Sequence, residues 1–337
     1  MKLLIAAVFL LSTLMRASQA GEAGVPTAVE ISQALERGKS VRTQKGVVPE
    51  ALIKTAVVLK AAGVRCGYTL VTIEDAKGEG GATYKMTERI KGVLPRNLDT
   101  EVVEYVGVIM MDADLALLSG TQTTTKVVTS PKATEKETVS AEMIVKGGEL
   151  SWVRKEKRAD DPEFVEKSDP VKLHGVRLVP HNALIALAAF AAKEPGFKAG
   201  VSSPFCVPSL DTGGTIDSFL IQPAWLETDV PKDKTNPAAK LVFRVRILEG
   251  ELNEKGMNVE PPSSEGWTDS LDWTLDANFH VGALPTSPDS LITAEIADPE
   301  TLDPNAPMDF VKIKEAMKAL EDKRRKDDEH LTKVPLK

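Results

Sequence analysis

The chain has 337 residues, with 42 Lys and Arg against 49 Asp and Glu, so its formal net charge is −7. This acidic balance argues against nucleic acid or an anionic membrane surface as the main partner, because phosphate binding needs a positive field. Aromatic residues make up only 5% of the chain, which disfavours surfaces that stack sugars or bases on exposed flat rings.

The first twenty residues, MKLLIAAVFLLSTLMRASQA, have the three parts of a secretory signal. Lys2 gives a positive start, residues 3–14 are apolar, and Ser18 and Ala20 are the small residues before a cleavage point. The apolar run is too short for a membrane span, which needs about 20 residues. We therefore expect removal of residues 1–20 and an exported, periplasmic or extracellular protein that is not integral to the membrane. An uncleaved anchor is the alternative.

Two helical patterns open the mature chain. Residues 27–37 place apolar residues on one stripe, with Gly38 as the expected stop. Residues 49–62 begin with Pro49, which is typical of a first helical turn, and also carry one apolar stripe. The sequence therefore predicts an N-terminal helical segment over residues 21–63.

From residue 64 onward, apolar residues recur at every second position, as in β-strands. Short connections favour an antiparallel meander, with strands expected over residues 64–70, 82–91, 101–111, 115–128, 136–146 and 149–157. The run 101–111 is apolar at almost every position, which predicts a strand covered on both sides.

The middle of the chain contains an unusual helix. Residues 158–170 are charged and read as a solvated loop, followed by a short strand within 171–179. Residues 182–193 are apolar almost all round, so the predicted helix there is buried. Twelve residues cannot cross a membrane, so this helix is expected inside the protein.

The second half returns to strands, expected over residues 201–210, 215–227, 240–249, 271–281 and 291–297, with a loop over 251–270. A last helix near 308–330 belongs to a C-terminal helical tail, 299–337. The sequence thus predicts a mainly β (α+β) fold in which residues 64–298 form a curved antiparallel sheet. This sheet would be a half-open barrel wrapped on the buried helix.

This layout resembles the half-open barrel of the periplasmic lipoprotein-carrier superfamily, the LolA/LolB-like clamshell, and uncharacterised exported domains related to it. The resemblance covers residues 64–298 and rests on the export signal and three segments: VGVIMMDADLALLSGTQTTT, HNALIALAAFAA and PFCVPSLDTGGTIDSFLIQP. In that family a cavity between the curved sheet and lid helices holds acyl chains. The resemblance implies a carrier or sensor of an apolar ligand. It assigns no ligand residue, since the family marks its cavity by apolarity.

Eight apolar or aromatic side chains on predicted strand faces are candidates for lining such a cavity: Tyr84, Met86, Ile90, Met143, Trp152, Trp273, Leu275 and Phe279. The same residues would equally form a packed core, which is the commoner fate of such side chains. One short helix offers little apolar volume to fill a sheet of about ten strands, and this favours the cavity.

Only Cys66 and Cys206 occur in the sequence. In an oxidising compartment two cysteines indicate one disulfide, but two buried free thiols are an equally good interpretation. A Cys-ligated zinc site is excluded by the count, because structural zinc usually takes four N or S ligands. Nothing else in the sequence indicates a metal or a cofactor.

The triplet Asp211-Thr212-Gly213 matches the turn of aspartic proteases, where two aspartates share a proton. Pro208 interrupts the strand that should support it, so a hairpin turn is the favoured interpretation. We therefore expect a non-enzymatic, exported protein that binds an apolar small molecule or lipid, or a protein partner in the envelope. Two alternatives stay open: a structural or interaction module with a filled core, and an exported hydrolase that uses Asp211.

Overall fold

The computed structural model describes residues 25–42, 53–96, 99–158, 161–184, 186–187, 204–210, 216–225, 241–261, 271–275, 281–283 and 292–331. The predicted export signal, the turn at 211–214 and Phe279 lie outside these residues. Among the described residues, no helix has the length and apolarity needed to cross a membrane.

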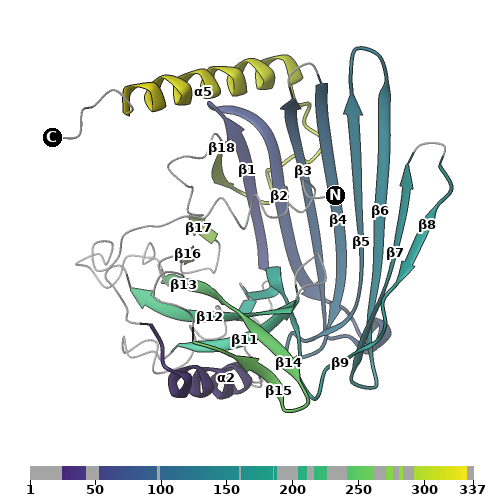
Figure 1. The fold of residues 1–337 in the computed structure, drawn as a ribbon, viewed down its shortest axis with the longest axis vertical. Helices are drawn as coiled ribbons and strands as arrows, with labels where there is room; N and C mark the ends of the chain where they lie inside the picture. Colours follow the sequence, from purple (N-terminus) through teal and green to yellow (C-terminus); the bar gives the residue numbers. More distant parts are fainter. Residues whose placement is uncertain are drawn as a thin grey trace.

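A large antiparallel sheet dominates the structure (Figure 1). Its strands follow the order β18-β1-β2-β3-β4-β5-β6-β7-β8, and β9 also pairs with β7. Among the described strands this path ends at β18 and β8 and does not close into a barrel. The bounds are β1 (Ile53–Ala61), β2 (Val64–Asp75), β3 (Tyr84–Arg96), β4 (Asp99–Met111), β5 (Leu117–Thr129), β6 (Thr134–Lys146), β7 (Glu149–Arg158), β8 (Phe164–Lys167), β9 (Val171–Lys172) and β18 (Ile292–Ala297).

The predicted meander of six strands is confirmed as β2 to β7. The predicted helix over residues 49–62 is wrong, because β1 occupies its second half. Ala56 and Val57 are neighbours in sequence and both are buried, as in a strand covered on both faces. The pairing of β1 with β18, for example Ala56 with Ala297, comes from the far end of the chain. No local pattern announces such a partner.

A second sheet has the order β10-β11-β12-β13-β16-β17, and a separate hairpin joins β14 to β15. The bounds are β10 (Val179–Pro180), β11 (Phe205–Leu210), β12 (Ile216–Trp225), β13 (Leu241–Leu248), β14 (Gly250–Asn253), β15 (Gly256–Val259), β16 (Leu271–Leu275) and β17 (Val281–Ala283). Strands β10 and β11 run parallel, and the other pairs are antiparallel.

This second sheet corrects several predictions. The expected loop over 251–270 contains the hairpin of β14 and β15. The expected strand over 271–281 is two strands that pair antiparallel, so the chain reverses between them. Alternation of apolar residues survives such a reversal and therefore does not reveal it. In the first sheet, the expected loop over 158–170 contains the exposed edge strand β8.

The main core lies between the two sheets. Residues His181–Ala183 form a short 3-10 helix, η2, and Leu184 and Leu187 continue it as fully buried residues. They pack in one cluster with side chains from β2 to β7 and from β11 and β12. The start of the predicted buried helix is therefore where the sequence placed it. Its later residues lie outside the described part of the chain.

Helix α2 (Ala28–Arg42) begins with a capping box, in which the Thr27 amide donates to Glu30 Oε2 at 2.7 Å and the Glu30 amide donates to Thr27 Oγ1 at 3.3 Å. The helix runs past Gly38, which was the expected stop. A Cβ at Gly38 would lie 2.0 Å from the carbonyl oxygen of Cys206. Glycine is therefore needed there for close packing of α2 on β11.

The predicted C-terminal helix is confirmed as α5 (Phe310–Leu331). Its buried residue Ile313 packs in a small cluster with Ala61, Cys66 and Val93 at one end of β1, β2 and β3. This cluster is separate from the main core, and Figure 1 shows α5 across that end of the sheet.

Candidate functional site

We call one side of the large sheet the inner face: the side on which Met86, Glu88 and Ile90 of β3 lie. Residues that face one another across paired strands share a side of the sheet. One row across the inner face is apolar and belongs to the main core: Ile73, Met86, Ile109, Gly120, Met143 and Trp152. Here the large sheet packs against η2, β11 and β12.

The next two rows of the inner face contain polar and charged side chains as well as apolar ones. The adjacent row runs from β1 to β8 through Thr55, Val71, Glu88, Gly107, Gln122, Ala141, Arg154 and Glu166. The row after it runs through Val57, Thr69, Ile90, Tyr105, Thr124, Val139, Glu156 and Phe164. The alternation of apolar residues along the strands therefore does not produce a wholly apolar face. Polar and charged side chains begin one row beyond the core.

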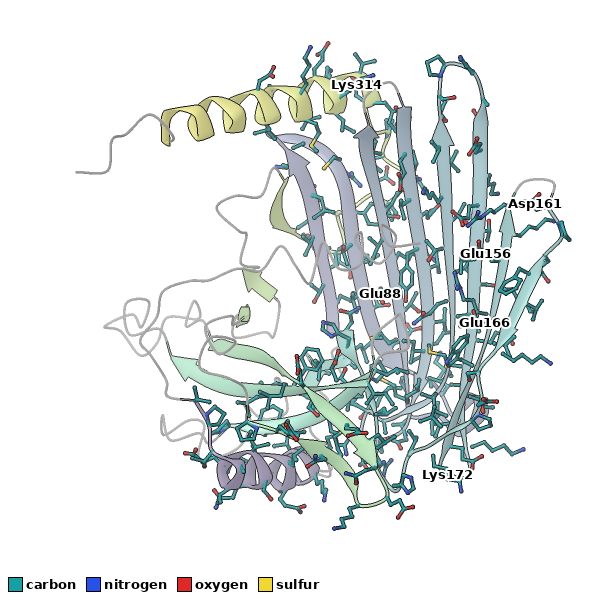
Figure 2. The ribbon with its side chains drawn as sticks, in the orientation of Figure 1. Glu88, Glu156, Asp161, Glu166, Lys172 and Lys314 are labelled. Atoms are coloured by element: carbon teal, nitrogen blue, oxygen red, sulfur yellow. The ribbon has the colours of Figure 1, made fainter. Side chains whose placement is uncertain are left out.

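Glu88 is the most unusual residue of these rows. Only 2% of it is exposed. The side-chain amide of Asn182, in η2, donates a hydrogen bond to Glu88 Oε1. Burial raises the pKa of Glu88 to about 7, although the nearby Tyr105 hydroxyl lowers it in part. Figure 2 shows Glu88 within the sheet, away from Glu156 and Glu166 on β7 and β8.

Tyr105 reaches toward Glu88 because Gly107 has no side chain. Gly107 faces Glu88 across the paired strands, and Tyr105 is two residues away on the same side of β4. A Cβ at Gly107 would lie 2.6 Å from the Tyr105 hydroxyl and 3.1 Å from its Cζ. The ring therefore lies over Gly107. Burial and the neighbouring carboxylate both raise the pKa of Tyr105, so its hydroxyl stays protonated.

Four buried polar atoms of the inner face, Thr55 Oγ1, Thr69 Oγ1, Glu88 Oε2 and Tyr105 Oη, have no well-formed hydrogen bond in the described structure, although the Tyr105 hydroxyl and the Glu88 carboxyl interact with each other. They come from β1, β2, β3 and β4 and lie in two adjacent rows. We call these four residues the polar cluster. Native proteins pair the large majority of buried polar atoms, so four such atoms on one patch are unusual.

The other buried or half-buried carboxylates described on the inner face, Glu101, Glu137 and Glu156, have bases beside them. Glu101, 2% exposed, lies 3.7 Å from Lys126 Nζ. Glu156 lies 3.0 Å from Arg154 and 2.8 Å from Arg158. Arg158 also lies 3.1 Å from Glu137. Among the described side chains, Glu88 is the one buried carboxylate of this face for which the structure gives no ion pair.

Seven of the eight predicted cavity residues divide into three groups, and Phe279 lies outside the described residues. Met86 and Met143 are buried in the main core, and Tyr84 and Trp152 pack against it. Ile90 is buried one row beyond the polar row, beside the polar cluster. Trp273 and Leu275 lie on β16, in the second sheet. The structure thus brings five of the eight onto one face of the large sheet, most of them as core.

The two cysteines are buried free thiols. Cys66 packs in the cluster beneath α5, whereas Cys206 packs in a different cluster beneath α2. The disulfide is therefore not formed, and the alternative of two buried thiols describes this structure. Burial raises the pKa of Cys66 to about 11 and that of Cys206 to about 12. Thiols of this kind are inert at neutral pH.

Two chemical candidates remain: the hydrolase residue Asp211 and a metal site. Asp211 lies outside the described residues, although β11 and β12 pair on either side of it as the predicted hairpin. Within the described part of the chain, no three or more His, Cys, Asp or Glu side chains gather closely enough to hold a metal ion.

Sequence reasoning missed the polar cluster, although one signal was present. Met86, Glu88 and Ile90 alternate with polar residues, so the strand period places a carboxylate on the apolar side. Thr55, Thr69 and Tyr105 gave no comparable signal, because Thr and Tyr are ordinary strand residues. Their convergence depends on the register of four strands.

Comparisons with known proteins add little to this geometry. No protein-family model matches the chain, and no curated protein matches it. Among solved structures, the chain is similar to a beta-barrel-like protein of domain of unknown function DUF1849 from Brucella abortus. The identity is 12% and the TM-score 0.36, over 68% of this chain and 89% of that one.

Proposed function

We propose that this protein is a non-enzymatic binding protein, and that its ligand is an amphipathic molecule held on the inner face of the large sheet. The observation that carries the proposal is the polar cluster: Thr55, Thr69, Glu88 and Tyr105 each bury a polar atom that, apart from the contact between Glu88 and Tyr105, has no partner among the described residues. A ligand with a polar head would satisfy these atoms.

The side chains around the polar cluster are apolar and would contact the alkyl part of such a ligand. Val57, Val71 and Ile90 are buried on the same two rows, so an alkyl chain beside them would stay out of water. This refines the expectation of a purely apolar ligand, because the polar cluster requires a hydrogen-bonding group as well. The resemblance to LolA/LolB-like carriers and the predicted export signal would place this binding in the envelope.

The alternative of a filled structural module makes a different prediction. In a filled module, buried hydroxyls are paired inside the protein, and each unpaired one costs about 1–3 kcal/mol. If the Thr69 hydroxyl is paired, as a filled module requires, replacing Thr69 with the equally shaped Val should lower stability. If the hydroxyl is unpaired, as the proposed binding site requires, the same replacement should raise stability. Thr69→Val is the variant of choice, since Thr69 lies beside Glu88. Thr87→Val, on the opposite side of β3, is the matched control.

The direct test is binding of N-phenyl-1-naphthylamine, an apolar fluorophore with one N–H group, to the purified protein. We expect micromolar affinity, about −8 kcal/mol. Thr69→Leu should weaken binding about tenfold by filling the cluster, whereas Thr87→Leu should leave it unchanged. Absence of binding to the wild type, together with a Thr69→Val variant that is less stable than the wild type, would support the structural module instead.

A further inference from the structure

We infer that the polar head of the ligand is cationic, a protonated amine that pairs with Glu88. This inference rests on the proposed function and names the class of ligand for the same site. It follows from what Glu88 lacks, from the oxygen atoms around it, and from the charges elsewhere on the inner face.

The first step is the missing base. Glu101, Glu137 and Glu156 are buried or half-buried carboxylates of the inner face, and each lies within 4 Å of a Lys or Arg nitrogen. Glu88 is as buried as Glu101, yet the structure gives it a neutral donor, Asn182. A buried carboxylate is costly unless a positive charge accompanies it. A cationic ligand would supply that charge.

The second step is the set of acceptors. Asn182 occupies Oε1 of Glu88 and leaves Oε2 without a well-formed hydrogen bond in the described structure. The hydroxyls of Tyr105 and Thr69 lie on the two strands that flank β3. The Tyr105 hydroxyl interacts with the Glu88 carboxyl, and neither hydroxyl has a hydrogen bond to another described residue. Both residues face Ile90, the inner-face neighbour of Glu88. An ammonium group has three N–H donors, which matches one carboxylate oxygen and two hydroxyls on three adjacent strands.

The third step excludes the other kinds of head group. An anionic head would place a second negative charge against a buried carboxylate that has no base beside it in the described structure. A neutral hydroxyl head would use the hydrogen bonds but would leave the charge of ionised Glu88 uncompensated. The order of affinity at a pH where Glu88 is ionised is therefore amine, alcohol, carboxylate.

The groups that face Glu88 do not change charge near pH 7, so a pH dependence of amine binding there comes from Glu88 itself. Tyr105 stays protonated because its pKa is raised. Asn182 does not titrate, and Val71 and Gly107 on the paired strands carry no charge. His181, next to Asn182, stays neutral above its lowered pKa of about 4. Amine binding should therefore strengthen as the pH rises through 7, because the amine needs the ionised form of Glu88.

The experiment is displacement of bound N-phenyl-1-naphthylamine by three probes with the same chain: decylamine, 1-decanol and decanoate. At pH 8 we expect decylamine to bind about tenfold more tightly than decanol, with decanoate weakest. Glu88→Gln should abolish the preference for the amine over decanol. Glu104→Gln, at an exposed position on the other side of β4, should retain the preference.

The possible results separate this inference from the function on which it rests. Equal or tighter binding of decanol or decanoate, or an amine preference that survives in Glu88→Gln, overturns the cationic head and leaves the binding function standing. Failure of the fluorophore and of all three probes to bind overturns both. The wild type provides a second test, because its amine preference should fall between pH 8 and pH 6 whatever the variant does.

Discussion

Replacement of Glu88 by Gln should make the protein more stable at neutral and alkaline pH. Burial raises the pKa of Glu88 from its ordinary value of 4.5 to about 7 in the folded state. The folded protein therefore binds the Glu88 proton more tightly than the unfolded chain does. Its contribution to stability is fully present below pH 4.5 and is lost as the pH rises through 7.

The size of the effect follows from the shift. The difference between 4.5 and about 7 corresponds to about 3 kcal/mol lost above pH 7, at about 1.4 kcal/mol for each pKa unit. Gln resembles the protonated acid and can still accept from Asn182. We therefore expect Glu88→Gln to exceed the wild type by about 3 kcal/mol at pH 8 and by almost nothing at pH 4.5.

The measurement is the free energy of unfolding by urea at several pH values for the wild type, Glu88→Gln and Glu104→Gln. The free energy of unfolding of each variant must be compared with that of the wild type at the same pH, because His181 changes the stability with pH in the opposite direction to Glu88. Burial lowers the pKa of His181 to about 4, so its contribution is lost as the pH falls from 6.5 toward 4. The pH dependences that come from Glu88 and from His181 nearly cancel in the wild type, so a titration of the wild type by itself would show neither.

A parallel pH dependence of the wild type and Glu88→Gln between pH 4.5 and pH 8 would refute this reasoning. So would a Gln variant that is less stable than the wild type at pH 8, since that would place a paired, stabilising charge at Glu88. Glu104→Gln controls for loss of a negative charge from the same sheet, and we expect it to follow the wild type.

Three further predictions concern other buried groups. His181→Phe should keep the edge-on contact with Phe219, where the ring centres lie 4.8 Å apart, and should remove the His181 contribution to the same titration, so that the stability of the variant rises as the pH falls from 7 toward 4.5. Gly107→Ala should displace the Tyr105 ring and cost about 1–3 kcal/mol by urea unfolding; an unchanged stability would mean that the ring moves freely. Cys66 and Cys206 should not react with Ellman's reagent until the protein is denatured, when two thiols should appear in unreduced protein; detection of none would reinstate the disulfide.

Several elements could be predicted from local sequence because each carries its own signal. The strands β2 to β7 alternate with short turns between them, so their order and antiparallel pairing follow from neighbours in the chain. Helix α5 and the buried start of the helix after Pro180 also follow from apolar spacing alone. These features depend on interactions between residues that are close in sequence, and a period in the sequence records them directly.

Other elements required the tertiary structure. The segment that begins at Pro49 has spacing compatible with a helix, but β1 forms there because β2 and β18 pair with it on either side. The strand expected over 271–281 reverses in the middle. Whether a residue pattern becomes one strand, two strands or a helix depends on partners that are distant in the chain, and alternation does not identify them.

The polar cluster also has one feature that the local sequence predicts and others that only the tertiary structure decides. The sequence alone determines that Glu88 falls on the same side of its strand as Met86 and Ile90, because the strand period is two. It does not determine that Thr69 and Tyr105 face Ile90, that Gly107 leaves room for the Tyr105 ring, or that Asn182 reaches Glu88 from another element. Those contacts depend on strand register and on the packing of η2 against the sheet, which only the folded chain decides.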